Sequence, residues 1–367
     1  MRQKLILLGT LSVLSVLGSV ELRRSQGQVY PGQQGDVRVT VGERQVLRRA
    51  ETRNWFPNIH RMANGNLIAT CQTAPDETNP QAAEVARRFI STDGAETWKA
   101  LGSHDTGGPS KLTLRDNTFL NLWFYTVRQG DGWVTKVVRS TDNGFTYTTE
   151  ENVPVHVENV REGAKGTGMV FDGGLVEMDN GDLLATMYGY FQNDKKYRSI
   201  LVRSTDGAHS WHYVSTIAYD PTVGREGFCE PAMIRTGPSR LLVTMRTGSG
   251  TPMYQCRSMD AGKTWSEPTV IADRGVEPDL VMTDDGILVC SYGRPNIYVM
   301  CSPDAGGENW TDPTLIFEGH STCYTGLAKI GPKEILLIHD ARQHKQPGDD
   351  RPYNYVFTVP LTVERVR

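Results

Sequence analysis

The sequence is poor in cysteine and carries almost no excess of charge. Six cysteines are scattered over 367 residues, and none of them forms the Cys-x-x-Cys spacing of a zinc site. Small buried strand residues are as good an interpretation of these cysteines as disulfides. The 39 lysines and arginines nearly balance the 42 aspartates and glutamates. This balance gives no whole-chain reason to expect a nucleic acid or an anionic membrane surface as a partner.

Long hydrophobic runs are also missing, with one short exception. Leu5 to Leu17 is mostly apolar, follows the basic residues Arg2 and Lys4, and precedes small and polar residues. The run is too short and too interrupted for a good membrane span, and its arrangement is typical of a secretory signal peptide. We predict a signal peptide and short lead at residues 1–27, a single domain at residues 28–367, and a secreted or periplasmic protein. An uncleaved signal anchor is the alternative.

The chain does contain an internal repeat of the form Ser-x-Asp-x-Gly-x-Thr-Trp. The five copies read STDGAETW, STDNGFTY, STDGAHSW, SMDAGKTW and SPDAGGENW. They begin at positions 91, 140, 204, 258 and 302, so their starts lie 49, 64, 54 and 44 residues apart. Spacing of this size predicts one four-stranded propeller blade per repeat.

The residue types of the repeat predict a tight turn between two strands. Ser and Asp side chains bond to backbone amides in such turns, and glycine supplies the positive φ that the turn needs. The closing aromatic residue begins the next strand and packs its ring beneath the turn. We therefore interpret the repeats as structural turns rather than as sites of chemistry.

The two ends of the chain supply the strands that five repeats leave out. Residues 324–340 read as two strands, and the segments 353–365 and 37–47 are also strand-like. We expect the two termini to complete a sixth blade together, because shared closure leaves no open sheet edge. The predicted fold is an all-β, six-bladed β-propeller with no second domain.

Five repeats of this kind, known as Asp boxes, on a six-bladed array resemble the sialidase (neuraminidase) superfamily. The resemblance implies a site on the axial face of the propeller. Three arginines there hold the substrate carboxylate, a Tyr nucleophile is paired with a Glu, and an Asp is the acid/base. That scheme uses no metal and no organic cofactor, and none is expected here. Because a fold alone does not give a function, each residue has to be placed separately.

Two of the implied residues lie in one block of sequence. The segment from Phe228 to Trp265 is similar to the sialidase block in which a Glu opens one strand and an Arg ends the next, before a repeat. The similarity assigns Glu230 as the paired Glu and Arg246 as the second arginine of the triad.

Three more residues follow from their spacing relative to the family pattern. Arg294 lies eight residues before Ser302 of the fifth repeat, which is the relation of the third triad arginine to its repeat. Tyr324 lies sixteen residues before Asp340. This matches the Tyr nucleophile and the carboxylate that steadies the first arginine, with Asp in place of the usual Glu.

These residue types suit an anionic substrate. A tyrosine with its reference pKa of about 10 is a poor nucleophile, so a neighbouring carboxylate such as Glu230 has to take its proton during attack. A neutral Tyr avoids the repulsion that a carboxylate nucleophile would meet from an anionic sugar. Arginines present planar donor forks that grip a carboxylate through two bonds.

The sequence departs from the family pattern at the first arginine. Aligning Pro57 with the proline of the Arg-Ile-Pro motif places Trp55 where the arginine is expected, and Arg53 and Arg61 are out of register. A buried carboxylate with too few donors is unfavourable, so stacking on a sugar face is the alternative role for Trp55.

The acid/base is expected in the loop before the first repeat. That loop reads QTAPDETNPQAAEVARR and offers Asp76, Glu77 and Glu84. Asp76 is the first choice by residue type, and Asp105 is a further candidate.

Together these assignments predict an exported glycosidase of sialidase type, which retains the anomeric configuration and acts on terminal acidic sugars of glycans. In this hypothesis Tyr324 attacks, Glu230 assists and Asp76 protonates the leaving oxygen, while Arg246 and Arg294 hold a carboxylate.

Two alternatives keep the fold. A hydrolase or lyase of another acidic polysaccharide would use His60 or His320 as acid or base, with Trp55 stacking on the sugar. A non-catalytic propeller that binds glycans would keep its affinity without Tyr324 or Glu230. The sequence does not decide the sugar, the linkage, the cysteine pairing or the oligomeric state.

Overall fold

A computed structural model of the chain describes residues 36–73, 86–103 and 108–366. The predicted signal peptide, Asp76 and the other loop candidates Glu77, Glu84 and Asp105 lie outside these residues. The regular elements of the described part are β-strands, apart from one turn of 3-10 helix, η1 (Ala164–Gly166). No helix in the described part is long and apolar enough to cross a membrane.

Three sheets have four strands each, and in all three the order in space follows the order in sequence. The first contains β3 (Trp55–Arg61), β4 (Leu67–Gln72), β5 (Ala86–Ser91) and β6 (Lys99–Ser103). The second contains β16 (Cys229–Arg235), β17 (Leu241–Arg246), β18 (Met253–Ser258) and β19 (Thr269–Ala272). The third contains β20 (Asp279–Met282), β21 (Leu288–Gly293), β22 (Ile297–Ser302) and β23 (Thr314–Phe317).

A fourth sheet has nine strands. On one side it contains β7 (Lys111–Thr113), β8 (Phe119–Leu122), β9 (Tyr125–Gln129), β10 (Gly132–Ser140) and β11 (Thr148–His156). On the other side it contains β12 (Thr167–Glu177), β13 (Leu183–Gly189), β14 (Arg198–Ser204) and β15 (Trp211–Ala218). Strand β9 pairs with both β10 and β12, and β11 pairs with both β10 and β15. Seven of the nine strands therefore form a closed ring of pairings.

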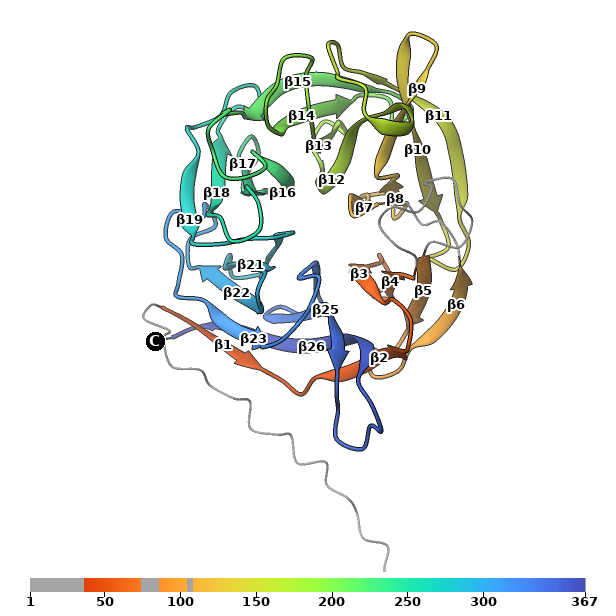
Figure 1. Cartoon of the computed structure of the whole chain (residues 1–367), viewed down its shortest axis with the longest axis vertical. Coiled ribbons are helices and arrows are strands. Elements are labelled where there is room, and N and C mark those ends of the chain that lie inside the picture. The colour runs from red at the N-terminus through yellow and green to blue at the C-terminus, as the bar shows by residue number, and fades with distance from the viewer. Residues whose placement is uncertain (1–35, 74–85, 104–107, 367) are drawn as a thin grey trace, which may run out of the picture.

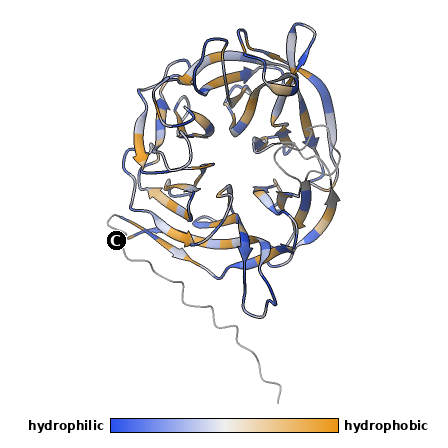
Figure 2. Cartoon of the chain, in the orientation of Figure 1, coloured by the Kyte–Doolittle hydropathy of each residue, from blue (hydrophilic) through white to orange (hydrophobic). Residues whose placement is uncertain are grey.

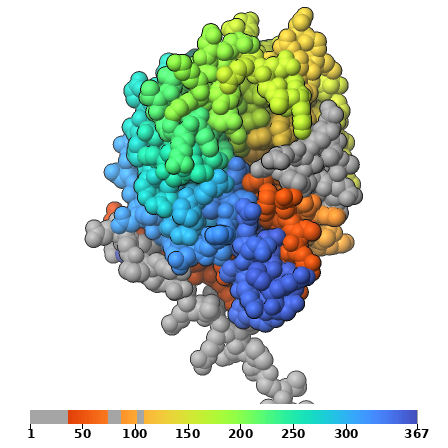
Figure 3. Space-filling model, in the orientation of Figure 1, coloured from red at the N-terminus to blue at the C-terminus, as the bar shows by residue number. Residues whose placement is uncertain are grey.

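The fifth sheet joins the two ends of the described chain. It contains β1 (Val37–Val41), β2 (Gln45–Ala50), β24 (Thr325–Lys329), β25 (Glu334–His344) and β26 (Tyr353–Arg365). Strand β1 pairs with the last residues of β26, and β2 pairs with its first half. The red and blue ends of the chain accordingly lie side by side (Figures 1 and 3). The prediction that both termini build one sheet is confirmed.

The hydrophobic core lies between neighbouring sheets, which surround a common centre (Figure 1). One cluster combines Val289 and Val299 of the third four-stranded sheet with Leu337 and Phe357 of the terminal sheet. Hydrophobic residues occur along the strands of every sheet (Figure 2). Strands covered on both faces need no alternation of polar and apolar residues, and β17 is accordingly buried at all six positions.

The five Ser-x-Asp repeats occupy equivalent places, because each begins with the last residue of a strand, namely β5, β10, β14, β18 or β22. In four of them the Ser hydroxyl donates to an Asp carboxylate oxygen at 2.7–2.8 Å. It also accepts the backbone N–H four residues later, at 2.8–3.0 Å. In the fifth repeat, which is one residue longer, Ser302 Oγ instead donates to the carbonyl of Asp304 at 3.0 Å. The side-chain bonds expected from the repeat are therefore present.

Candidate functional site

A pocket of about 580 Å³ opens at the ends of several strands. Four residues singled out from the sequence line it. Trp55 begins β3, Arg246 ends β17, Arg294 follows β21, and Tyr324 precedes β24. Glu230, the second residue of β16, is 4 % exposed and lies behind the pocket wall, where it contacts Tyr324. The structure therefore brings these five residues together.

Glu230 is the centre of the hydrogen-bond network. Its Oε1 accepts from the Tyr324 hydroxyl at 2.6 Å and also from Arg246 Nη1. Its Oε2 accepts the backbone N–H of Glu277 at 2.8 Å. A carboxylate that holds a phenol in this way can take its proton when the phenol oxygen attacks.

The Tyr324 phenol is neutral in the resting site. Burial raises its pKa well above the usual range, and the negative charge of Glu230 raises it further, while the Arg246 guanidinium works in the opposite direction. The ring is fixed by an edge contact with Phe56, whose ring centre is 4.5 Å away. The side chain is positioned as a nucleophile that needs a base, because it is not ionised on its own.

Arg246 is enclosed by acidic groups. Besides Glu230 it contacts Glu226, at 3.0 Å from Nη2 to Oε2. Burial alone would lower the pKa of Arg246, but the surrounding charges, Glu230 first, raise it. The guanidinium therefore stays charged, and much of its charge is already neutralised by these two carboxylates.

Arg294 has no such counter-charge. It is half-buried, and its guanidinium donates to Ser249 Oγ at 3.0 Å and to the Thr322 carbonyl at 2.5 Å. It makes no ion pair with any residue that the structure describes. A cation that faces a pocket without a carboxylate partner favours an anionic ligand.

A third arginine, Arg342 of β25, lines the same pocket and was missed in the sequence analysis. Its guanidinium carbon lies 4.4 Å from the centre of the Trp55 ring, and that of Arg53 lies 4.8 Å from it. The Trp55 ring therefore already contacts two cations. Within the described part of the chain Arg342 has no ion pair either.

Asp340 has partners other than the arginine expected from its spacing. It is fully buried and accepts bonds from the Ser321 hydroxyl at 2.9 Å, the Thr322 hydroxyl at 2.6 Å and the Thr322 backbone N–H at 2.9 Å. Burial raises the pKa of Asp340 to about 6, although these donors lower it. Asp340 therefore holds the loop that leads into Tyr324.

The backbone departs from regular strand geometry at three similar positions near the site. Pairing is interrupted by a register shift between Trp55 and Asn58 in β3, and by another between Cys229 and Ala232 in β16. Phe56, Glu230 and Glu277 have φ values of 50°, 47° and 42°, and each directly precedes a proline. A bulge re-aims a side chain and is frequent next to active sites, and the irregularity in β16 accompanies the contact of Glu230 with Tyr324. The proline that follows each of these three residues was the signal in the sequence.

His320 and His60, which were considered for an alternative chemistry, line different cavities, and a third histidine, His339, lines neither. His320 lines the pocket, whereas His339 is fully buried among the rings of Phe317 and Phe357. His60 lines a second cavity of about 430 Å³, where β3, β7, β12, β16, β20 and β24 approach one another. Burial lowers the pKa of His60 to about 3, so the ring is neutral there.

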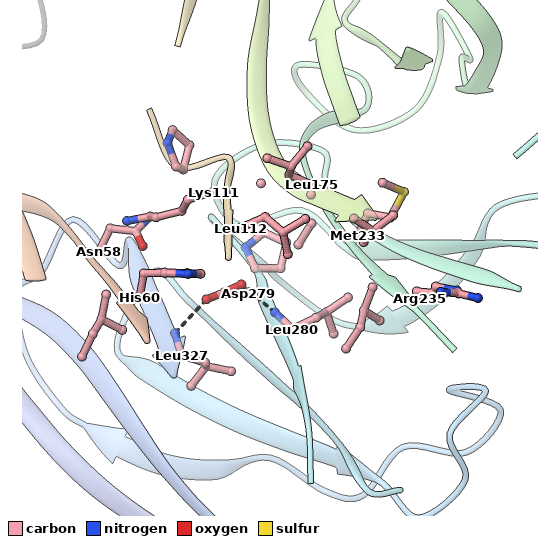
Figure 4. Close-up of a pocket in the computed structure, with 18 of the residues that line it drawn as sticks. Asn58, His60, Lys111, Leu112, Leu175, Met233, Arg235, Asp279, Leu280 and Leu327 are labelled. Atoms are coloured by element: carbon pink, nitrogen blue, oxygen red, sulfur yellow. Dashed lines mark hydrogen bonds between the residues drawn. The ribbon is translucent and has the colours of Figure 1, made fainter. Parts of the chain in front are cut away.

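The second cavity also receives Lys111 and Asp279 (Figure 4). Asp279 accepts the backbone N–H groups of Leu280 at 2.8 Å and Leu327 at 2.7 Å, and burial raises its pKa to about 6. Burial lowers the pKa of Lys111 to about 7, although the charge of Asp279 opposes this shift. No group of three or more metal-ligating side chains occurs among the residues that the structure describes. All six cysteines are buried free thiols.

The model of one family, described as the BNR repeat-like domain, matches residues 103–355, which is more than half of the chain. The chain belongs to the BNR repeat-like domain family. The matched part of this BNR repeat-like protein covers four of its five Ser-x-Asp repeats and the segments that carry Glu230, Arg246, Arg294 and Tyr324. None of the curated protein sequences matches the chain.

Solved structures show which folds the BNR repeat-like chain resembles. A protein of unknown function from Dyadobacter fermentans is 22% identical, with a TM-score of 0.72 over 91% of this chain and 100% of that one. The Hadza microbial sialidase Hz136 is 16% identical, with a TM-score of 0.63 over 89% and 69%. The Penicillium chrysogenum alpha-L-arabinanase, complexed with arabinobiose, is 15% identical, with a TM-score of 0.61 over 87% and 98%. The predicted resemblance to sialidases is confirmed at the level of the fold.

Proposed function

We propose that the protein is a glycoside hydrolase of sialidase type, which acts on a terminal acidic sugar with retention of configuration. The observation that carries the proposal is the contact of 2.6 Å between the Tyr324 hydroxyl and Glu230 Oε1, beside a pocket lined by Arg246, Arg294 and Arg342. A Tyr nucleophile in place of a carboxylate is the recognised exception among glycosidases for anionic sugars.

The reaction requires one bond to form and one to break at the anomeric carbon. The Tyr324 oxygen attacks that carbon while its proton passes to Glu230 Oε1. The glycosidic bond breaks, and the leaving oxygen takes a proton from an acid, for which we propose Asp76. Water then attacks the anomeric carbon and gives one proton to Asp76, while the bond to Tyr324 breaks and the Tyr324 oxygen takes its proton back from Glu230.

The arginines favour an acidic sugar over a neutral one. Arg294 and Arg342 bring two positive charges to the pocket that no described carboxylate balances, and Arg246 adds a third guanidinium. A substrate carboxylate would supply the missing counter-charge through paired bonds to guanidinium groups. This set of residues supports a sialidase-like substrate more than the neutral sugars of an arabinan. In this arrangement Arg342 replaces the first triad arginine.

Two further parts of the proposal concern architecture and location. We propose that the nine-stranded sheet represents two blades, β7–β8–β10–β11 and β12–β15, fused by β9, which brings the count to six. We also propose that residues 1–27 direct export. N-terminal sequencing of the mature protein, produced in a secreting host, tests the second point, since an intact residue 1 would contradict it.

The test of activity is hydrolysis of an aryl sialoside by the wild-type protein and by Tyr324→Phe. We expect measurable wild-type turnover and a loss of at least about 100-fold in the variant, the lower end of what a positioned proton-transfer group contributes. Tyr213→Phe removes a hydroxyl from an exposed ring outside the pocket and serves as the matched control. Proton NMR of the first-formed sugar anomer measures retention.

The alternatives give different results in the same assays. If sialosides of every linkage are inert, the sialic acid version is wrong, and uronic acid polysaccharides become the next substrates. Ultraviolet-absorbing unsaturated products from these would indicate a lyase. Glycan binding that survives both Tyr324→Phe and Glu230→Gln, without turnover, would indicate a binding protein.

A further inference from the structure

Two buried acidic residues behind Glu230 take no part in the proposed reaction. Asp172 lies on β12 and is 2 % exposed, and Glu277 lies two residues before β20 and is 8 % exposed. The two carboxyl groups lie close enough to change each other's pKa. Glu277 also reaches the site directly, because its backbone N–H donates to Glu230 Oε2 at 2.8 Å.

Two carboxyl groups form a hydrogen bond only if one of them carries a proton. Asp172 Oδ1 and Glu277 Oε2 are buried and have no hydrogen-bond partner among the described residues. A single proton between the two groups would satisfy both. Burial raises the pKa of both carboxyls well above the usual range, and the charge of Glu230 adds to the shift, while Arg246 opposes it.

The backbone of Glu277 connects the pair to Glu230. Glu277 has a φ of 42°, which is unfavourable for a residue with a side chain and is maintained only when surrounding contacts hold it. In this conformation its N–H points at Glu230 Oε2. That bond leaves Oε1 for the hydroxyl of Tyr324. A fixed Glu277 side chain therefore fixes the orientation of the Glu230 carboxylate.

We propose that Asp172 and Glu277 share one proton and act as a positioning pair for Glu230, an inference that rests on the proposed function of the Tyr324–Glu230 contact. Sharing a proton has a second effect. The pair carries one negative charge instead of two, so it repels Glu230 less and lets it stay ionised to accept the phenol proton. The titratable or charged groups around the pair are Glu230, Arg246, Tyr188, Cys229 and Tyr324.

The shared proton can be observed without any substrate. Infrared spectra of the full chain at pH 8 should contain the carbonyl band of a protonated carboxyl group, which shifts in D₂O. Asp279 and Asp340, with pKa values of about 6, are ionised at this pH and do not contribute. Glu277→Gln should remove the band. A wild-type spectrum without it overturns the proposal.

The positioning role is tested by NMR of protein labelled with ¹³C in the tyrosine ring, with the Tyr324 signal assigned by its loss in Tyr324→Phe. Glu277→Gln replaces the shared proton with an amide hydrogen, so the Tyr324 signal should keep its position. Glu277→Leu has a similar size but cannot form the bond, so the signal should move. Equal behaviour of the two variants, in either direction, would contradict a positioning role.

Kinetics adds a readout that separates this inference from the proposed function. In an active enzyme, Glu277→Leu should lower kcat by about 10- to 100-fold with little change in KM, the range typical for a group that orients a catalytic residue. Glu277→Gln should retain most of kcat. A wild-type protein without turnover would refute the proposed function. The infrared and NMR results would still show whether Asp172 and Glu277 share a proton and position Glu230.

Discussion

Replacing Glu230 with Gln should cost far more stability than the same replacement at Glu226, although both residues bind Arg246. The two carboxylates differ mainly in burial, since the side chain of Glu230 is 4% exposed and that of Glu226 is 37% exposed. Glu230 accepts bonds on both oxygens, from Tyr324 and Arg246 on one and from Glu277 N–H on the other. A glutamine amide in either orientation would point its NH₂ group at one of these donors.

The expected magnitude follows from three effects. An unsatisfied buried donor costs about 1–3 kcal/mol, and removing one partner of a buried ion pair costs about 3–5 kcal/mol, reduced here because Glu226 still contacts Arg246. Relief of repulsion between Glu230 and the Asp172–Glu277 pair acts in the opposite direction. It should be smaller, because the attraction to Arg246 is a direct contact. We therefore expect a net loss of about 3 kcal/mol for Glu230→Gln and less than about 1 kcal/mol for Glu226→Gln, as for other exposed pairs.

Urea unfolding followed by tryptophan fluorescence measures both losses. The wild type and the two variants are compared at neutral pH in the same buffer, and the free energy of unfolding is taken from the linear extrapolation. Equal losses in the two variants would refute the reasoning from burial. A Glu230→Gln protein more stable than the wild type would show that repulsion among the three carboxyls outweighs the attraction between Glu230 and Arg246.

Three further results are expected. Arg342→Met should raise KM for an acidic substrate by about tenfold, which is equivalent to about 1.4 kcal/mol of lost carboxylate binding. It should leave KM for a neutral analogue unchanged. Equal effects on both substrates would argue against a charge contact between Arg342 and the substrate. Ser258→Ala removes three hydrogen bonds of its turn and should lower stability by about 1–3 kcal/mol, whereas Ser302→Ala removes one and should cost less in the same urea assay. Lys111 has a pKa of about 7 in the folded protein, against 10.5 ordinarily. Between these pH values the unfolded chain binds more protons than the folded protein, so the free energy of unfolding should rise with pH across this range. Unfolding experiments at a series of pH values should show a smaller rise for Lys111→Met.

The repeats made most of the fold predictable from the sequence. Each repeat has a fixed turn chemistry, so the strand before it must end at its Ser, and this places β5, β10, β14, β18 and β22 without further information. The long strand at Tyr353–Arg365 was likewise readable from its apolar residues. The fusion of two strand groups through β9 was not predictable, because it depends on pairings between segments that have no turn motif of their own.

The site was only partly predictable from the sequence. Recognisable spacing at strand ends allowed the prediction of Tyr324, Glu230, Arg246 and Arg294. Arg342 has no motif, although it lies two residues after Asp340 on one strand, where alternate side chains share a face.

Asp172 lies at the register shift of β12, between Phe171 and Leu175, whereas Glu277 lies before β20 and has a positive φ. In a regular strand, side chains point to alternate faces of the sheet with a period of two residues, and this period allows the facing residues to be predicted from the sequence. A bulge interrupts the period. The prolines after Phe56, Glu230 and Glu277 mark where that period fails.

The shared terminal sheet has a consequence for the order of events during synthesis. Strands β1 and β2 precede every other described strand in the sequence, yet both pair with β26, the last described strand. Their ladder groups stay unpaired until β26 has been synthesised. Contacts this distant in sequence slow folding, so a chaperone that shields β1 and β2 would protect the growing chain at an exposed sheet edge.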